Sequence, residues 1–196
     1  SEKVFPNVSV YCCITVFTKQ PKEYFMYNNK KINYSDIDNT TFNLFSQNAS
    51  ENTLKSICKI TNGIATLRDN VYMMGNNKFD EPCIVSITNG KEYNSIIYPY
   101  NQDGKIIDEL DFKKENPKTY DYLITQKDEL SKRDKGNKTY PAWYAYGRSQ
   151  SLIIPKKNKV IYIPCFINPK KFELYVNTPT LFKGCLCIEP NDEKDI

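Results

Sequence analysis

The sequence predicts an α/β protein of the α+β type, with a mixed, mostly antiparallel β-sheet, one long helix and a few short helices. Asp103-Gly104 predicts a hairpin turn. Asn116-Pro117 predicts the start of the long helix and Gly136 its end, with apolar residues at helical spacing between them. Short β-branched and aromatic runs separated by turn residues predict strands over residues 84–87, 93–100, 152–154, 160–163, 172–176 and 181–188.

The first 53 residues differ in composition from the rest. Residues 8–18 are β-branched, aromatic and apolar on both faces, as in a strand buried within an α/β sheet. We therefore expect residues 1–20 to be the last strand of an upstream domain. Residues 21–53 are polar and rich in Asn, and we expect a linker with weak structure. Residues 54–196 would then form the main domain.

Composition narrows the class of protein. Apolar residues make up 40% of 196 positions, which predicts a globular chain with a sizeable core. The formal net charge of +4 is compatible with a polyanionic partner. The chain has no histidine, which removes Ser–His and Cys–His nucleophile pairs, imidazole bases and His-ligated metals.

The seven cysteines are scattered among apolar residues, which suits reduced core thiols in a cytoplasmic protein. Cys185 and Cys187 are too close in sequence for the usual zinc knuckle, so we predict no metal site. No apolar run is long enough to cross a bilayer, and the N-terminus does not resemble a signal peptide. We expect no membrane partner.

Residues 143–150 (WYAYGRSQ) contain the only tryptophan and one of three arginines. We expect a strand in which Arg148 and Gln150 point to the same face. A guanidinium fits the O6/N7 edge of guanine, and an amide fits the N6/N7 edge of adenine. The same spacing fits a half-buried strand whose Arg148 and Gln150 meet solvent or carboxylates. Trp143 is expected to anchor the strand in the core, and Gly147 to form its bend.

A second candidate is the polar loop that contains Thr66, Arg68 and Asp69. Residues 54–60 predict a helical turn that runs into a strand, Gly63 lies in a turn signal, and residues 71–74 begin another strand. The loop between them could be a recognition loop on a rigid scaffold. It could equally be a surface turn with a local contact between Arg68 and Asp69.

Lys156, Lys157 and Lys159 are the densest positive charge in the chain and lie close in sequence to Arg148. They could contact the phosphates of a nucleic acid, or they could form a solubilising hairpin tip. Arg133 lies at the end of the expected long helix. It could touch phosphate, although the helix dipole explains its position equally well.

Three stretches together resemble the C-terminal portion of the TaqI-like adenine-N6 DNA methyltransferases of restriction–modification systems, some of which are fused to endonucleases. They are residues 63–72, residues 122–133 with 143–150, and residues 10–14. The resemblance implies that residues 1–20 end a catalytic domain and that residues 54–196 form a target recognition domain. It implies a bacterial cytoplasmic protein whose partners are double-stranded DNA and the methyltransferase catalytic domain.

The resemblance also implies which residues contact DNA and which functions belong to the absent catalytic domain. The Asn-Pro-Pro-Tyr type motif and the glycine-containing S-adenosylmethionine loop of that family are missing, and Asn168-Pro169-Lys170-Lys171 does not replace the motif. We expect no catalysis and no cofactor in this chain, since S-adenosylmethionine would bind the absent catalytic domain. Base contacts would come from Arg148 and Gln150, then Thr66, Arg68 and Asp69, phosphate contacts from Lys156, Lys157, Lys159 and Arg133, and structural anchoring from Trp143, Gly63 and Gly147.

Two other functions remain open. A small metal-dependent nuclease would need clustered acids, and Asp108, Glu109 and Asp111 are the densest group outside the C-terminal tail, although acids are ordinary at a helix start. A protein–protein interaction module of a methyltransferase complex could use the aromatic residues of the 20–53 segment. A type I specificity subunit is a near relative of the main interpretation, but no long heptad helix is present.

Overall fold

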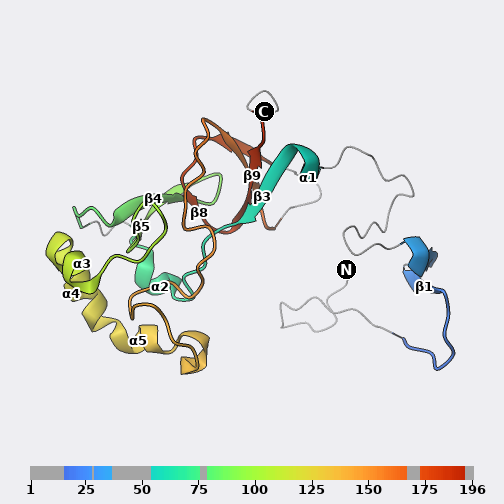
Figure 1. The fold of residues 1–196 in the computed structure, drawn as a ribbon, viewed down its shortest axis with the longest axis horizontal. Helices are drawn as coiled ribbons and strands as arrows, with labels where there is room; N and C mark the ends of the chain where they lie inside the picture. The colour runs from blue at the N-terminus through green and yellow to red at the C-terminus, as the bar shows by residue number, and fades with distance from the viewer. Residues whose placement is uncertain (1–15, 28, 37–53, 76–78, 167–172, 193–196) are drawn as a thin grey trace. The chain divides into compact units, whose positions relative to one another are not determined.

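The computed structural model describes residues 16–27, 29–36, 54–75, 79–166 and 173–192. The chain divides into two units, Ser1–Glu51 and Asn52–Ile196. The expected strand over residues 8–18 lies outside the described residues except for 16–18, which have no regular structure. The described part confirms an α+β fold with largely antiparallel sheets (Figure 1).

The first unit contains a small antiparallel hairpin where we expected a weakly structured linker. Strand β1 (Tyr24–Tyr27) pairs with β2 (Lys30–Asn33), and a 3-10 turn, η1 (Tyr34–Asp36), follows. Asn29 takes a left-handed conformation (φ 62°) in the connection, which Asn tolerates better than most residues. The Nζ of Lys31 lies 4.3 Å from the centre of the Tyr24 ring.

A four-stranded antiparallel sheet, in the order β3-β9-β6-β7, begins and ends the second unit. Its strands are β3 (Cys58–Asn62), β6 (Val160–Pro164), β7 (Tyr175–Asn177) and β9 (Cys185–Pro190), and the short helix α1 (Leu54–Ile57) runs into β3. One face buries a small core of Val160, Tyr162, Cys185, Cys187 and Phe182. The helical turn that we expected to lead into a strand over residues 54–60 is present.

A three-stranded sheet, in the order β5-β4-β8, lies over the larger core. Strand β4 (Ile84–Thr88) is antiparallel to β5 (Tyr93–Ile97) and parallel to β8 (Leu181–Phe182). The hairpin turn predicted at Asp103-Gly104 is present: Gly104 has φ 72°, and Tyr100 bridges to Ile106. Strands β4 and β5 are rich in β-branched and aromatic residues, which explains why their positions were predictable from sequence.

The predicted long helix starts at Pro117 and ends at Gly136, but the structure divides it. Its pieces, after α3 (Glu109–Glu115), are α4 (Pro117–Thr125), α5 (Lys127–Ser131) and the 3-10 turn η2 (Arg133–Gly136), which Figure 1 shows in succession. Each break follows a hydroxyl that bonds its own backbone: Thr125 donates to Tyr122 O, and Ser131 to Asp128 O. Such bonds compete with helix propagation.

Three strand predictions are wrong. Residues 71–74 belong mainly to the short helix α2 (Asp69–Tyr72), with only Met73 in an isolated bridge to Ile96. Residues 143–150 and 152–154 form turns and irregular backbone. In each case the local pattern allowed a strand, but contacts with distant residues set the backbone conformation.

Candidate functional site

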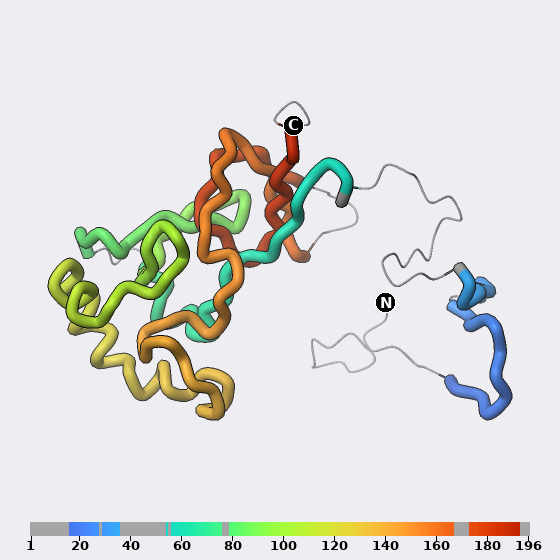
Figure 2. Tube along the Cα trace, viewed as in Figure 1, coloured from blue at the N-terminus to red at the C-terminus, as the bar shows by residue number. Residues whose placement is uncertain are grey.

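Two segments that we singled out from the sequence lie side by side, although about 80 positions separate them in the chain. Residues 62–66 and 147–151 run antiparallel (Figure 2). Their contacts are Gly147 N to Thr66 O at 2.9 Å, Arg148 N to Ala65 O at 3.1 Å, Gln150 Nε2 to Gly63 O at 2.5 Å, and Ser151 Oγ to Asn62 O. Main-chain and side-chain bonds therefore fix one segment against the other.

Two glycines allow this close approach. A Cβ atom on Gly63 would lie 2.5 Å from the carbonyl oxygen of Phe182, and one on Gly147 would lie 2.3 Å from Cγ of Leu67. Leu67 itself has φ 60°, so its backbone is held in the left-handed region. Both positions require glycine on steric grounds, in line with the anchoring role that we expected for them.

Trp143 packs between helices and the irregular segment that follows it. Its ring makes edge contacts with Tyr120 and Tyr144, at centroid distances of 6.0 and 5.3 Å, and Lys127 Nζ lies 5.0 Å from its centre. Its Nε1 donates a hydrogen bond of 2.8 Å to Glu109. Trp143 is partly buried and held on several sides, in line with an anchoring residue.

Residues 143–146 are held mainly by hydrogen bonds that involve side chains, and main-chain pairing with Thr66 begins only at Gly147. The Tyr72 hydroxyl donates to the carbonyls of Tyr144 and Ala145, at 3.0 Å each. Tyr146 N donates to the Tyr100 hydroxyl, and the Tyr146 hydroxyl donates to Ile97 O, both at 2.6 Å. Burial raises the pKa of Tyr100 to about 12 and that of Tyr146 well above its usual value.

Arg133 does not lie on the surface, which corrects its expected contact with phosphate. Only 2% of the residue is exposed, and its guanidinium donates to the carbonyls of Leu130 at 2.7 Å, Trp143 at 2.6 Å and Ala145. A buried guanidinium whose donors are taken by carbonyls cannot reach a nucleic acid. Arg133 instead ties the end of the helical region to residues 143–145.

Arg148 and Gln150 are both exposed, but not as neighbours on a strand face. Arg148 forms a two-point ion pair with Asp134, with Nη1–Oδ2 at 2.7 Å and Nη2–Oδ1 at 2.9 Å. The Tyr140 hydroxyl donates to the same carboxylate at 2.6 Å. Hydrogen bonds from Arg148 and Tyr140 hold the pKa of Asp134 well below its usual value. This carboxylate therefore stays ionised across the physiological pH range.

The loop around Thr66 borders an open depression of about 530 Å³. Thr66 is fully buried, and its hydroxyl donates to Asp69 at 2.5 Å and accepts from Arg68 N at 3.1 Å. The hydroxyl is thus occupied inside the loop, so Thr66 does not present it for a base contact. Its bond to Asp69 instead favours the first turn of α2 over the expected strand.

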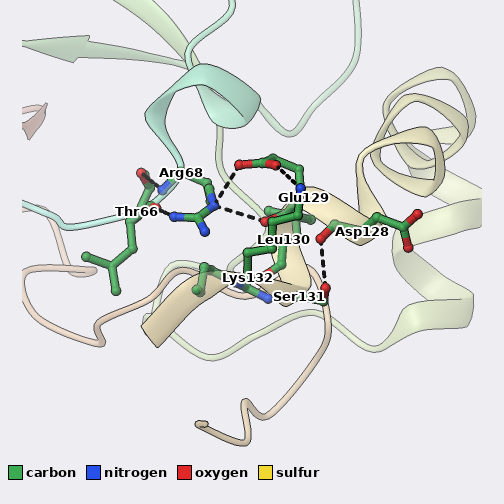
Figure 3. A network of polar contacts seen from close by, with 9 residues as sticks. Thr66, Arg68, Asp128, Glu129, Leu130, Ser131 and Lys132 are labelled. Carbon is green, nitrogen blue, oxygen red and sulfur yellow. Dashed lines mark hydrogen bonds and ion pairs between the residues drawn. The ribbon is translucent and has the colours of Figure 1, made fainter. Parts of the chain in front are cut away.

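Arg68 and Asp69 pair with other residues, not with each other. The guanidinium of Arg68 donates to the Glu129 carbonyl at 2.9 Å and lies 3.1 Å from its carboxylate (Figure 3). Asp69 lies 2.6 Å from Lys183 Nζ. The edge of the depression therefore carries two positive and two negative side chains, which form two ion pairs. Glu129 and Lys183 had no signal in the sequence, because both contacts join segments more than 60 positions apart.

The three lysines that we expected at phosphates lie on the irregular segment before β6. Lys156 and Lys159 are exposed, whereas Lys157 is partly buried and donates to Asn191 O at 3.2 Å. The expected strand before them is missing, so they do not form the tip of a regular hairpin. Residues 149–155 separate Arg148 from the first of these lysines in the chain.

The acids of the nuclease alternative have structural contacts. Asp108 caps α3 by accepting from Leu110 N at 3.0 Å, and Glu109 accepts from both Trp143 and Tyr120 at 2.8 Å. No group of three or more potential metal ligands is found within the described residues.

The described part of the chain contains no helix with the length and apolar character needed to span a membrane.

Comparison of this sequence with models of protein families and with curated proteins gives no match.

Proposed function

We propose that this chain recognises a specific sequence in double-stranded DNA, as the target recognition domain of an adenine-N6 methyltransferase of a bacterial, cytoplasmic restriction–modification system. The observation that carries the proposal is the antiparallel contact between residues 62–66 and 147–151. These segments belong to the stretches on which the resemblance to that family rests. Their contact provides one rigid support for Arg68, Arg148 and Gln150, three polar side chains suited to base edges.

In this proposal, affinity and specificity come from different residues. Lys156, Lys157 and Lys159 bind phosphates, release counterions and set the register on the duplex. Arg148 and Gln150 reach base edges, with Arg68 and Asp69 as secondary contacts. Methyl transfer and flipping of the target base belong to the catalytic domain that would bind S-adenosylmethionine.

A salt titration separates the two roles. Arg148→Ala is expected to lower the preference for the recognised duplex over random DNA by about tenfold, with little change in the salt dependence of binding. Lys156→Ala together with Lys157→Ala is expected to weaken binding to all duplexes alike and to reduce the slope of log K against log salt by about 2.

The matched control removes two lysines from another surface. Lys114 and Lys118 are exposed on α3 and α4, and replacing both with alanine should leave the preference and most of the slope unchanged. Equal salt slopes for the Arg148 and lysine variants, with equal losses on recognised and random duplexes, would reject the assignment of roles.

A further inference from the structure

Arg148 forms hydrogen bonds with Asp134 and Gly147 that leave one edge of its guanidinium open. The planar group has five N–H donors. Nη1 and Nη2 each give one hydrogen to Asp134, and Nη1 gives its second to Gly147 O at 2.8 Å. The two N–H groups that remain, on Nε and Nη2, point along the same edge. Neither has an acceptor within the parts of the chain that the structure describes.

This open edge has the form that a guanine requires. Two parallel N–H groups match the O6 and N7 acceptors in the major groove. The Arg148 side chain is 43% exposed, and that of Asp134 is 23% exposed. A ligand can therefore approach the open edge while the ion pair stays intact.

Two features of its surroundings hold Asp134 in place. The Tyr140 hydroxyl bonds its carboxylate at 2.6 Å, and the preceding residue, Arg133, is bonded to the carbonyls of Trp143 and Ala145. Asp134 and Lys135 both have left-handed backbones, with φ of 47° and 59°. Asp tolerates the left-handed region, whereas Lys rarely adopts it, so the surroundings impose the conformation of Lys135.

We propose that Asp134 is a positioning residue that orients the open edge of Arg148 toward a guanine, and so helps to determine the DNA sequence that is recognised. This inference rests on the proposed function above. A carboxylate near DNA opposes binding through charge repulsion, so Asp134 should lower affinity for DNA in general while improving discrimination. A purely structural residue would not have these opposite effects.

The test uses the full chain and a guanine analogue. A preferred duplex is first selected from a pool of random sequences. Each guanine is then replaced with 7-deazaguanine, which lacks the N7 acceptor, and dissociation constants are measured. At one guanine we expect the replacement to weaken the wild-type complex by about tenfold. Arg148→Ala should lose all sensitivity at that guanine.

Asp134→Asn should reduce the same sensitivity to about twofold, while its affinity for random duplex rises above that of the wild type. Asn is well suited to the left-handed backbone at this position, so the variant is expected to fold. Asp128→Asn removes the same charge from an exposed residue and should keep the tenfold effect. Tyr140→Phe, which removes one support of Asp134, should lower the sensitivity by a smaller factor.

Full sensitivity to 7-deazaguanine in both Asp134→Asn and Tyr140→Phe would overturn the role of Asp134. A selected duplex with no guanine that depends on Arg148 would also overturn it, while leaving the proposed function intact. Failure to select any duplex would instead reject the proposed function. The two failures are therefore distinguishable in one set of measurements.

Discussion

Two arginines close in the chain take opposite roles at the level of the residue. Arg133 is buried and donates to main-chain carbonyls, while Arg148 is exposed and pairs with Asp134. Burying a guanidinium is unfavourable unless its donors are satisfied, and here carbonyls satisfy them. The sequence alone did not distinguish the two arginines, because two of the carbonyls that bind Arg133, those of Trp143 and Ala145, come from a segment with no regular structure.

Replacing Arg133 tests whether this buried arginine has a structural role. Arg133→Lys removes the planar fork, which leaves the Trp143 carbonyl without its donor and the Ala145 carbonyl with only the Tyr72 hydroxyl, so we expect the free energy of unfolding to fall by about 3 kcal/mol. Urea denaturation measures this loss. Lys132→Ala, at the exposed neighbour, should change stability by less than about 0.5 kcal/mol. If Arg133→Lys keeps its stability and lowers the salt dependence of DNA binding, Arg133 contacts phosphate as the sequence predicted.

At the level of elements, helix α4 is capped by a residue distant in sequence. The Glu81 carboxylate accepts from the backbone N–H groups of Lys118 and Thr119, both at 2.8 Å. Asn116, the expected capping residue, uses its side chain differently: it accepts from Cys83 N and donates to Phe112 O. The helix start was predictable from Pro117, but the identity of the cap was not.

Glu81→Gln should lower stability at pH 7 by about 1 kcal/mol, the usual value of a helix cap. Burial raises the pKa of Glu81, but hydrogen bonds from Thr119 and Lys118 outweigh it and hold the pKa below its usual value. A lowered pKa stabilises the folded protein above the usual glutamate value, and this contribution is lost as the pH falls through the folded-state pKa. The stability difference between wild type and variant should therefore shrink in acid. A difference that stays constant from neutral to acid pH would contradict this.

Local patterns were sufficient for some elements and not for others. Strands β4, β5 and β6 and the hairpin at Gly104 follow from β-branched and aromatic runs and from turn residues, which act between near neighbours. Residues 71–74 and 143–150 were predicted as strands, but bonds from Thr66 and Tyr72 favour other conformations. Side-chain bonds to distant backbone leave no periodic signal in a sequence.

At the scale of the whole molecule, five of the 15 tyrosines are buried within the described part of the second unit. Tyr72, Tyr100, Tyr144, Tyr146 and Tyr162 are all buried, and their hydroxyls bond to backbone groups across the second unit. Burial raises the pKa of Tyr100, Tyr144 and Tyr162 to about 12. The folded protein thus holds these phenols in their neutral form, whereas the unfolded chain ionises them near pH 10.

This pattern predicts unfolding at alkaline pH. The stability that comes from the raised tyrosine pKa values is fully present below about pH 10, and it is lost as the pH rises toward 12, because the unfolded chain releases protons first. The part of the tyrosinate absorbance that comes from these buried tyrosines should appear together with the loss of secondary structure. Gradual ionisation of these tyrosines near pH 10 in a chain that stays folded would show that their hydroxyls are not buried.

The sequence indicated which segments form the candidate site, but not which contacts their residues make. The two segments were identified from residues 63–70 and 143–150, and the structure places their neighbouring ends side by side. The partners Asp134, Glu129 and Lys183 were not predictable, because no local sequence pattern joins any of them to the residue with which it pairs. They follow from the fold of the whole second unit.

The most direct test of DNA recognition is to incubate the full chain with a pool of random duplexes, sequence the bound fraction, and compare its affinity with that for shuffled DNA. The account predicts enrichment of one sequence that binds at least 1,000-fold more tightly than random duplex, the order of magnitude typical of specific sites. Equal affinity for every duplex, or no binding at low salt, would contradict it.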